Sequence, residues 1–187
     1  MSPRFDCLAT PLAGLQLLQR KPLGDNRGYL ERLFCATELH TLAPDKAIQQ
    51  INHTLTRQRG TVRGMHFQRP PHCEVKFVSC LRGQVFDVAV DLRHNSPTFL
   101  HWHAEVLSAD NHRTLVIPEG FAHGFQTLSD DCEMLYFHTA PYRADAEGGL
   151  HPQDPRSAIA WPLPISEMSP RDASHGLLDD DFSGLNL

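Results

Sequence analysis

Residues 75–93 read VKFVSCLRGQVFDVAVDLR, and this stretch decides the fold. Apolar and polar side chains alternate on both sides of a Leu-Arg-Gly turn at residues 81–83. Because successive side chains of a strand point to opposite faces, such alternation is typical of a β-strand with one face in a core. The stretch therefore predicts two β-strands separated by a turn. The alternating pairs are Val75/Lys76, Phe77/Val78, Ser79/Cys80, Phe86/Asp87, Val88/Ala89 and Val90/Asp91.

Further short segments of the same kind follow this pair of strands. We expect strands over His101–Leu107, Arg113–Ile117 and Met134–His138, with turns at residues 95–97 and 110–111. Many short strands at near-regular spacing, with little helical period, predict an all-β sandwich or barrel. No repeat or linker divides the chain, so we expect a single domain over residues 1–187.

Helices are expected to be few. One candidate covers Cys35–Leu42, with Thr37 at its N-terminal edge. The tail from about residue 162 is rich in Pro, Ser and Asp, and we expect coil with one short helix there.

Composition limits the class of protein. The chain has 187 residues, a net charge of −5 and five cysteines without metal-binding spacing. The acidic balance argues against a nucleic-acid partner. There is no apolar run near the ~20 residues of a membrane helix and no charged-then-apolar leader at Met1. We therefore expect reduced thiols, no membrane partner and a cytoplasmic location.

Residues 61–76, TVRGMHFQRPPHCEVK, carry the first chemical signal. An imidazole such as that of His66 can accept a proton near neutral pH. An ammonium such as that of Lys76 can stabilise the oxyanion that forms when a proton leaves the carbon beside a ketone. From the residues alone, both could equally be surface side chains on neighbouring strands.

Acidic residues on the strand of residues 84–92 carry a second signal. Asp87 and Asp91 share one face, and acids inside a closed barrel are costly unless they have partners. Asp87 is therefore either an ordinary solvent-facing residue or part of a pocket, where it orients a histidine or lysine.

Several motifs occur in one order along the chain: DNRG (25–28), Gln50-x-Asn52, VRGMHFQ (62–68), K-x-V-x-C-x-x-G-x-V-F-D-V-x-V-D-L-R (76–93), SPTF (96–99), IPEGFAHGF (117–125), the segment around Tyr136 and SPRDA (169–173). Together they resemble the dTDP-4-dehydrorhamnose 3,5-epimerase family over about nine tenths of the chain. The resemblance implies a cupin-like jelly roll, a homodimer and no cofactor. It also implies epimerisation of a nucleotide-linked 4-keto-6-deoxyhexose through an enolate, which feeds a deoxysugar such as rhamnose into cell-surface polysaccharide such as O-antigen.

The same resemblance assigns catalytic roles. It implies that His66 is the base, paired with Asp172, that Lys76 stabilises the enolate and that Tyr136 is the acid. Inversion needs two groups on opposite faces of the reacting carbon, which suits a separate base and acid. Without the resemblance, Tyr136 reads as a core residue, and the SPRDA segment reads as a helix start capped by Ser169.

Nine further residues are expected to contact the nucleotide sugar, six of them because they match family positions that hold it. Arginines suit the diphosphate, and amides suit a pyrimidine edge or a phosphate. His123 in the Gly-flanked AHGF motif could instead be a structural histidine. The set is Arg27, Glu31, Gln50, Asn52, Arg63, Asp87, His123, Glu147 and Arg171.

Two departures from the family pattern leave the substrate open. Glu31 stands one residue earlier than the family's usual glutamate, and Met65 replaces the common leucine. Both are expected to lie near the nucleotide or the sugar. The alternatives are an epimerase that inverts one centre, a CDP-linked or dideoxy substrate, and a sugar-nucleotide-binding cupin without turnover.

A metal-dependent function is the remaining alternative, because the chain has twelve histidines. His101, His103 and Glu105 alternate on one expected strand and could share a face. They lie outside the segment that carries the other site residues, so we expect no functional metal.

Overall fold

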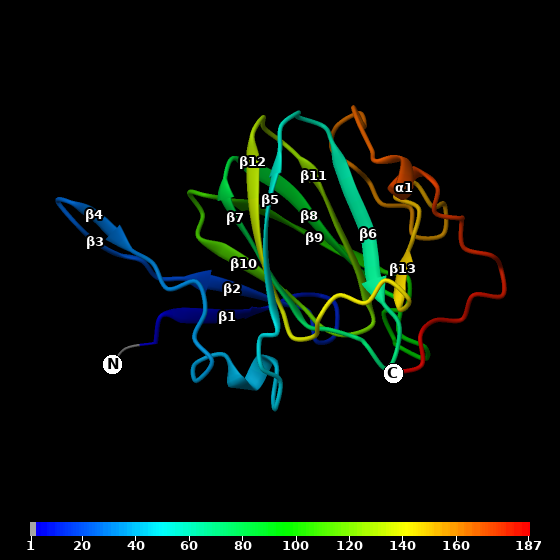
Figure 1. Cartoon of the computed structure of the whole chain (residues 1–187), viewed down its shortest axis with the longest axis horizontal. Helices are drawn as coiled ribbons and strands as arrows, with labels where there is room; N and C mark the ends of the chain where they lie inside the picture. The colour runs from blue at the N-terminus through cyan, green and yellow to red at the C-terminus, as the bar shows by residue number, and fades with distance from the viewer. Residues whose placement is uncertain (1–2) are drawn as a thin grey trace.

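The computed structural model describes residues 3–187 and places two antiparallel β-sheets face to face (Figure 1). The first sheet has six strands in the order β1 (Phe5–Ala9), β2 (Gln16–Arg20), β10 (Arg113–Ile117), β7 (Lys76–Arg82), β12 (Cys132–His138) and β5 (Gln50–Thr56). The second has five, in the order β13 (Glu147–Gly149), β6 (Val62–Gln68), β11 (Phe121–Thr127), β8 (Gln84–Asp91) and β9 (Trp102–Ser108). This arrangement confirms the predicted all-β jelly roll.

The alternation of residues 75–93 determines how the sheets pack. Val78 on β7 and Ala89 on β8 are fully buried in the core between the sheets. Their neighbours Phe77 and Val88 belong to two other apolar clusters, on the outer faces of the six- and five-stranded sheets. Each sheet is therefore apolar on both faces, and each outer face needs a cover.

The segment 33–48 covers the six-stranded sheet with apolar side chains, of which Leu39 is the most buried. The helix expected over Cys35–Leu42 is wrong, since this segment contains only a single 3-10 turn, η1 (His40–Leu42), without a side-chain N-cap. Glu38 is instead tied to the N-terminal strand region, because it accepts a hydrogen bond from the backbone N–H of Arg4.

The C-terminal part of the chain covers the five-stranded sheet. Its only helix among the described residues is α1 (Pro170–Ala173), and irregular backbone surrounds it. Among residues 3–187, no helix is long and apolar enough to cross a membrane. The covering side chains are Leu150, Ile159, Trp161, Leu178, Phe182 and Leu185.

A close approach between β6 and β11 shapes the end of the sandwich where the site lies. A Cβ atom on Gly64 would lie 2.5 Å from the Cα of Gly124, and Gly64 has φ of +130°, so both positions require glycine. The register shifts between His123 and Phe125, which leaves His123 directly opposite His66. These two histidines therefore belong to neighbouring strands of one sheet.

Candidate active site

A cavity of about 580 Å³ opens between the two sheets. Strands β5, β7 and β12 line it from one sheet, β6 and β11 line it from the other, and the residues around α1 close one side. Its size falls in the range of small-molecule sites. Eight of the expected site residues line it: Asn52, Arg63, His66, Lys76, His123, Tyr136, Arg171 and Asp172.

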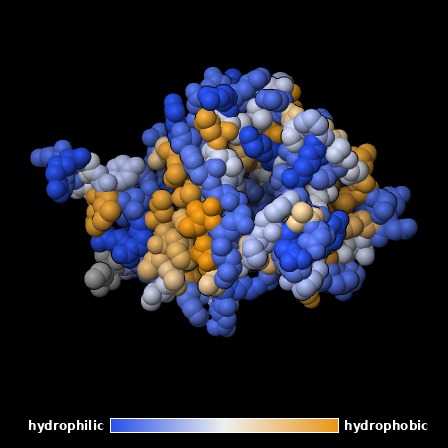
Figure 2. Space-filling model, in the orientation of Figure 1, coloured by the Kyte–Doolittle hydropathy of each residue, from blue (hydrophilic) through white to orange (hydrophobic). Residues whose placement is uncertain are grey.

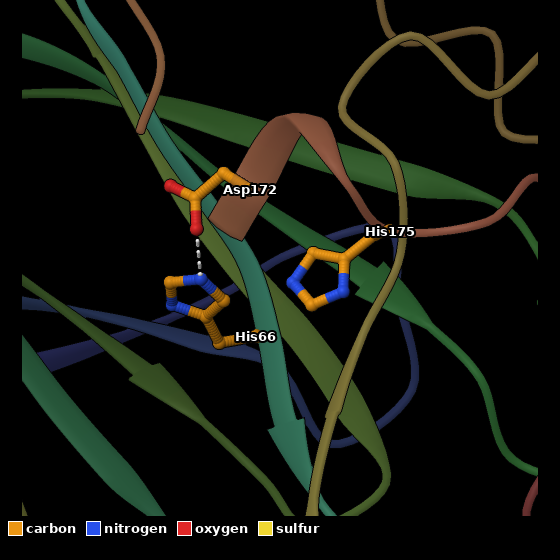
Figure 3. A group of neighbouring side chains, drawn as sticks. All are labelled: His66, Asp172 and His175. Carbon is orange, nitrogen blue, oxygen red and sulfur yellow. Dashed lines mark hydrogen bonds and ion pairs between the residues drawn. The ribbon is translucent and has the colours of Figure 1, made fainter. Parts of the chain in front are cut away.

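His66 and Asp172 form a hydrogen-bonded couple at the wall of the cavity (Figure 3). The Nε2 atom of His66 lies 2.8 Å from Oδ1 of Asp172, and the imidazole is about one-third exposed while the carboxylate is 5% exposed. The other oxygen of Asp172 accepts a hydrogen bond from the backbone N–H of Gly64 at 3.2 Å. The couple therefore ties α1 to β6.

The protonation of this couple follows from its surroundings. Burial acts to raise the pKa of Asp172, but the hydrogen bonds from His66 and Gly64 outweigh it and hold that pKa below its ordinary value. The carboxylate therefore accepts the bond and fixes the proton of neutral His66 on Nε2, which leaves Nδ1 as the basic nitrogen. Ser169 also caps α1, because its hydroxyl accepts from the N–H of Asp172 at 3.0 Å. The helix-start reading of this segment and the pairing with His66 are thus compatible.

Lys76 lies at the cavity with a buried glutamate beside it. Its Nζ is 3.3 Å from Oε1 of Glu74 and 3.5 Å from the carbonyl oxygen of His66. The second carboxylate oxygen of Glu74 is 2.7 Å from Nδ1 of His138. Burial opposes ionisation of Glu74, but His138 and Lys76 bring its pKa below the ordinary value. Glu74 therefore bridges a cation and an imidazole at the edge of the site.

Tyr136 faces the cavity from the sheet opposite His66. Its ring packs on the core between the sheets, and its centroid lies 6.1 Å from those of the His123 and His138 rings. Burial raises the pKa of its phenol. The hydroxyl therefore keeps its proton across the neutral pH range.

His123 is held by Asp87 beneath the cavity. Its Nε2 lies 3.0 Å from both carboxylate oxygens, and Asp87 is fully buried. Burial raises the pKa of Asp87, and the attraction of His123 opposes part of that rise. Asp91, on the same strand face, has a different role. Its carboxylate accepts bonds from Arg93, Ser96 and Thr98, and so it holds the turn after β8.

Polar residues surround the cavity mouth. Arg63 is exposed there, and among the described residues it has no ion-pair partner. Arg171 pairs with Glu147 of β13. Gln50 lies beside the cavity, since its side-chain amide donates to Asn52 at 3.1 Å. Arg63 is thus the cation best placed to accept an anionic ligand.

Two expected substrate residues neither line the cavity nor contact the other site residues. Arg27 is at the tip of the hairpin of β3 (Leu23–Asp25) and β4 (Gly28–Leu30), which projects away from the sheets (Figure 1). Its side chain is 89% exposed and pairs with Asp25. Glu31 binds Arg20 and His112, each at 2.8 Å, outside the cavity. Within a single chain neither residue reaches the other site residues.

One further expectation is changed by the structure. Met65 is fully buried in the cluster on the outer face of the five-stranded sheet, so its expected place near the substrate is wrong. His103 and Glu105 do bond at 2.9 Å on β9, but together with His101 they lie outside the cavity.

Three residues near the site were missed in the sequence, although the spacing of two of them could have indicated them. Glu74 and His138 stand two residues from Lys76 and Tyr136, and a period of two places side chains on one strand face. His175 lies two residues beyond the end of α1, and no spacing in the sequence indicates it. Its ring centroid lies 6.0 Å from that of His66.

A model of the dTDP-4-dehydrorhamnose 3,5-epimerase family matches residues 9–180. The chain belongs to this family. A dTDP-4-dehydrorhamnose 3,5-epimerase of Sinorhizobium fredii is 42% identical, with 87% of this chain and 84% of the relative covered. Membership makes the protein an isomerase of the epimerase type, so the alternative of a binding protein without turnover is set aside.

One solved structure and one further relative support the same family assignment. A dTDP-6-deoxy-D-glucose-3,5-epimerase of Legionella pneumophila, in complex with dTDP-4-keto-L-rhamnose, superposes with a TM-score of 0.90 at 36% identity and covers 98% of this chain and 99% of its own. A dTDP-4-dehydrorhamnose 3-epimerase of Streptomyces niveus is 43% identical, but over only 64% of this chain and 58% of the relative.

Proposed function

We propose that the protein inverts C3 and C5 of dTDP-4-dehydro-6-deoxy-D-glucose without a cofactor. One observation carries this proposal: the His66–Asp172 couple and Tyr136 face one cavity from opposite sheets, with Lys76 beside them. Protons on carbons adjacent to the C4 ketone are acidic because the ketone accepts the electron pair. The substrate therefore brings the electron sink, and the protein supplies the proton transfers.

In the first step Nδ1 of His66 takes the proton from the carbon. The C–H electron pair forms a double bond to C4, and the carbonyl pair moves onto the oxygen as an enolate. Asp172 stabilises the imidazolium that results, because its carboxylate accepts the Nε2 proton. The Lys76 ammonium is the group placed to stabilise the enolate oxygen.

In the second step the phenol of Tyr136 donates a proton to the same carbon from the other side of the sugar. The enolate pair returns to the carbonyl, and the tyrosinate and imidazolium exchange with solvent to restore both groups. Because His66 stands on the five-stranded sheet and Tyr136 on the six-stranded sheet, the two protons move on opposite faces. Opposite faces give inversion.

The nucleotide diphosphate is assigned to the cavity mouth. Arg63 and Arg171 supply cations there, and Arg guanidinium groups suit phosphate oxygens. The amides of Gln50 and Asn52 are assigned to the base or a phosphate, and Glu147 orients Arg171. Asp87 holds His123 in its rotamer against the substrate.

A homodimer supplies the missing Arg27. Apolar side chains are exposed on the projecting hairpin, where Tyr29 is 62% and Leu30 is 73% exposed, and on edge strand β5, where Ile51 is 58% exposed. Figure 2 shows apolar atoms gathered on this side of the molecule. We assign this surface to a second copy, whose hairpin brings its own Arg27 to the neighbouring cavity.

The cellular setting follows from the substrate. Nucleotide sugars and five free cysteines suit a reducing cytoplasm. The product would enter rhamnose or a related deoxysugar of a cell-surface polysaccharide. The chain acts as one domain, because its tail supplies Asp172 to the site on β6.

A second candidate is inversion of C3 alone. The identity to the 3-epimerase of Streptomyces niveus favours it. Both candidates use the same base and acid, so only the number of labelled carbons separates them.

The test is incubation with dTDP- and CDP-4-keto-6-deoxyglucose in deuterated water, followed by NMR. We expect deuterium at C3 and C5 of the dTDP sugar with no added metal or nicotinamide. The His66→Ala control should lose exchange by ~10²–10⁴-fold. Label at C3 alone supports the second candidate. Absence of exchange from both sugars, or activity that requires a divalent metal, contradicts the mechanism.

A further inference from the structure

His175 is a histidine that the proposed mechanism does not use. Its Nε2 is buried, and within residues 3–187 it has no hydrogen-bond partner. Figure 3 shows its ring beyond the end of α1, with a nitrogen pointing toward His66 and Asp172. Buried polar atoms nearly always have a partner, so this nitrogen is free to bind a water, a ligand or an ion.

The chain makes room for this ring. Strand β13 pairs with β6 so that Gly149 lies opposite His66. A Cβ atom on Gly149 would lie only 2.0 Å from Nε2 of His175. Only glycine at this position therefore lets the imidazole of His175 approach His66.

The three side chains form a compact donor set. One ligand atom each from His66, Asp172 and His175 lie within 4.8 Å of one another. In a tetrahedral zinc site with bonds of ~2.0–2.1 Å, ligand atoms stand about 3.3 Å apart. His66 and Asp172 are already closer than that, at 2.8 Å. An ion bound by all three side chains would bring the ligand atoms to this spacing.

We propose that His66, Asp172 and His175 form a binding site for a divalent transition-metal ion. The donor set suits Zn²⁺ best, and the bound ion inhibits the enzyme. Two imidazoles and one carboxylate are a common zinc ligand set, in which a water or a substrate group takes the fourth position. The site differs from the His101, His103 and Glu105 group, which lies outside the cavity.

Inhibition follows from the tautomer of His66. An ion on Nε2 displaces the proton that Asp172 holds there, and the neutral ring then carries its proton on Nδ1. Nδ1 is the nitrogen that takes the proton from the sugar, so the base is blocked. This consequence rests on the proposed function, whereas ion binding does not.

Binding is measured first, without substrate. Zn²⁺ alone is titrated by calorimetry, and Co²⁺ is followed by the visible absorption of a tetrahedral complex. We expect one ion per chain. His175→Leu removes one ligand, so it should weaken binding by more than the roughly 10–100-fold that loss of a second-shell partner costs. His175→Gln repeats the test in case leucine disturbs the fold. His53→Leu, at an exposed histidine, is the matched control and should bind as the wild type does.

Activity is measured second. Zn²⁺ should inhibit the wild type, a chelator should reverse the inhibition, and His175→Leu should stay active and resist Zn²⁺. Equal ion binding by the wild type and both His175 variants overturns the site. If ion binding depends on His175 but the protein has no epimerase activity, the ion site is supported and the proposed function is contradicted.

Discussion

The Nε2 atom of His66 on β6 lies 2.8 Å from Oδ1 of Asp172, a residue 106 positions later in the chain. The C-terminal tail thus supplies the carboxylate that pairs with the proposed base. Asp172 does this from a helix of only four residues, Pro170–Ala173, which Ser169 caps. The bond therefore depends on a short helix in which Asp172 is held at two points, by Ser169 at its N–H and by Gly64 at its carboxylate.

Asp172→Asn should lower kcat by roughly 10²–10⁴-fold, because the amide neither fixes the His66 tautomer nor stabilises the imidazolium. Ser169→Ala is the control, since it removes the helix cap but leaves the carboxylate. It should cost about 1 kcal/mol of stability with kcat nearly unchanged. Kinetics together with urea unfolding separate the two effects. Equal losses of kcat in both variants would mean that Asp172 acts only through the helix.

Lys76→Met should lower kcat by roughly 10²–10³-fold, as loss of one oxyanion donor does, with little change in KM. Glu74→Gln keeps the shape but releases Lys76 and His138, so a smaller fall in kcat is expected. Steady-state kinetics with the dTDP sugar give both values. A rise in KM alone for Lys76→Met would assign Lys76 to the diphosphate.

Asp87 and Asp91 share a strand face, but substitution of each should have a different effect. Asp91→Ala leaves Arg93, Ser96 and Thr98 without their buried acceptor, so it should destabilise the fold by about 2–4 kcal/mol. Asp87→Asn should mainly lower activity, because it loosens His123. Urea unfolding and kinetics on both variants check this. The reverse pattern contradicts the two roles.

Tyr29→Ser combined with Leu30→Ser should convert a dimer to a monomer and raise KM. Light scattering gives the mass, and Arg27→Ala is the comparison: it should raise KM and leave the dimer intact. The reason is that Arg27 carries charge at the hairpin tip, while the two neighbours carry the exposed apolar surface. A monomeric wild type, or an Arg27→Ala variant with an unchanged KM, would contradict the proposal that Arg27 of a second copy contributes to the site.

The strands could be predicted because a period of two is a local signal, as in residues 75–93. The same signal could not separate Asp87 from Asp91. Their partners differ in origin: His123 comes from a distant strand, and Arg93 is two residues away. The 33–48 segment lacked a helix because its apolar side chains cover a sheet, and tertiary contact outweighed local preference.

The site was predictable where a motif fixes both the residue and its strand face, as for His66 and Lys76. His175 was not, because its position depends on the path of the tail and on the space at Gly149. Arg27 and Glu31 show the opposite situation. The motif marks them, but a single chain keeps them outside the cavity.

Tyr136→Phe tests the central claim, that base and acid act from opposite sheets. The variant keeps the ring and its packing, and both exchange and inversion are followed by NMR in deuterated water. His66 should still lift the proton and return deuterium to the same face, so label should enter the substrate while inversion falls much further. If exchange and inversion fall by the same factor, Tyr136 only positions the sugar. If neither falls, the acid lies elsewhere and the two-sided mechanism is contradicted.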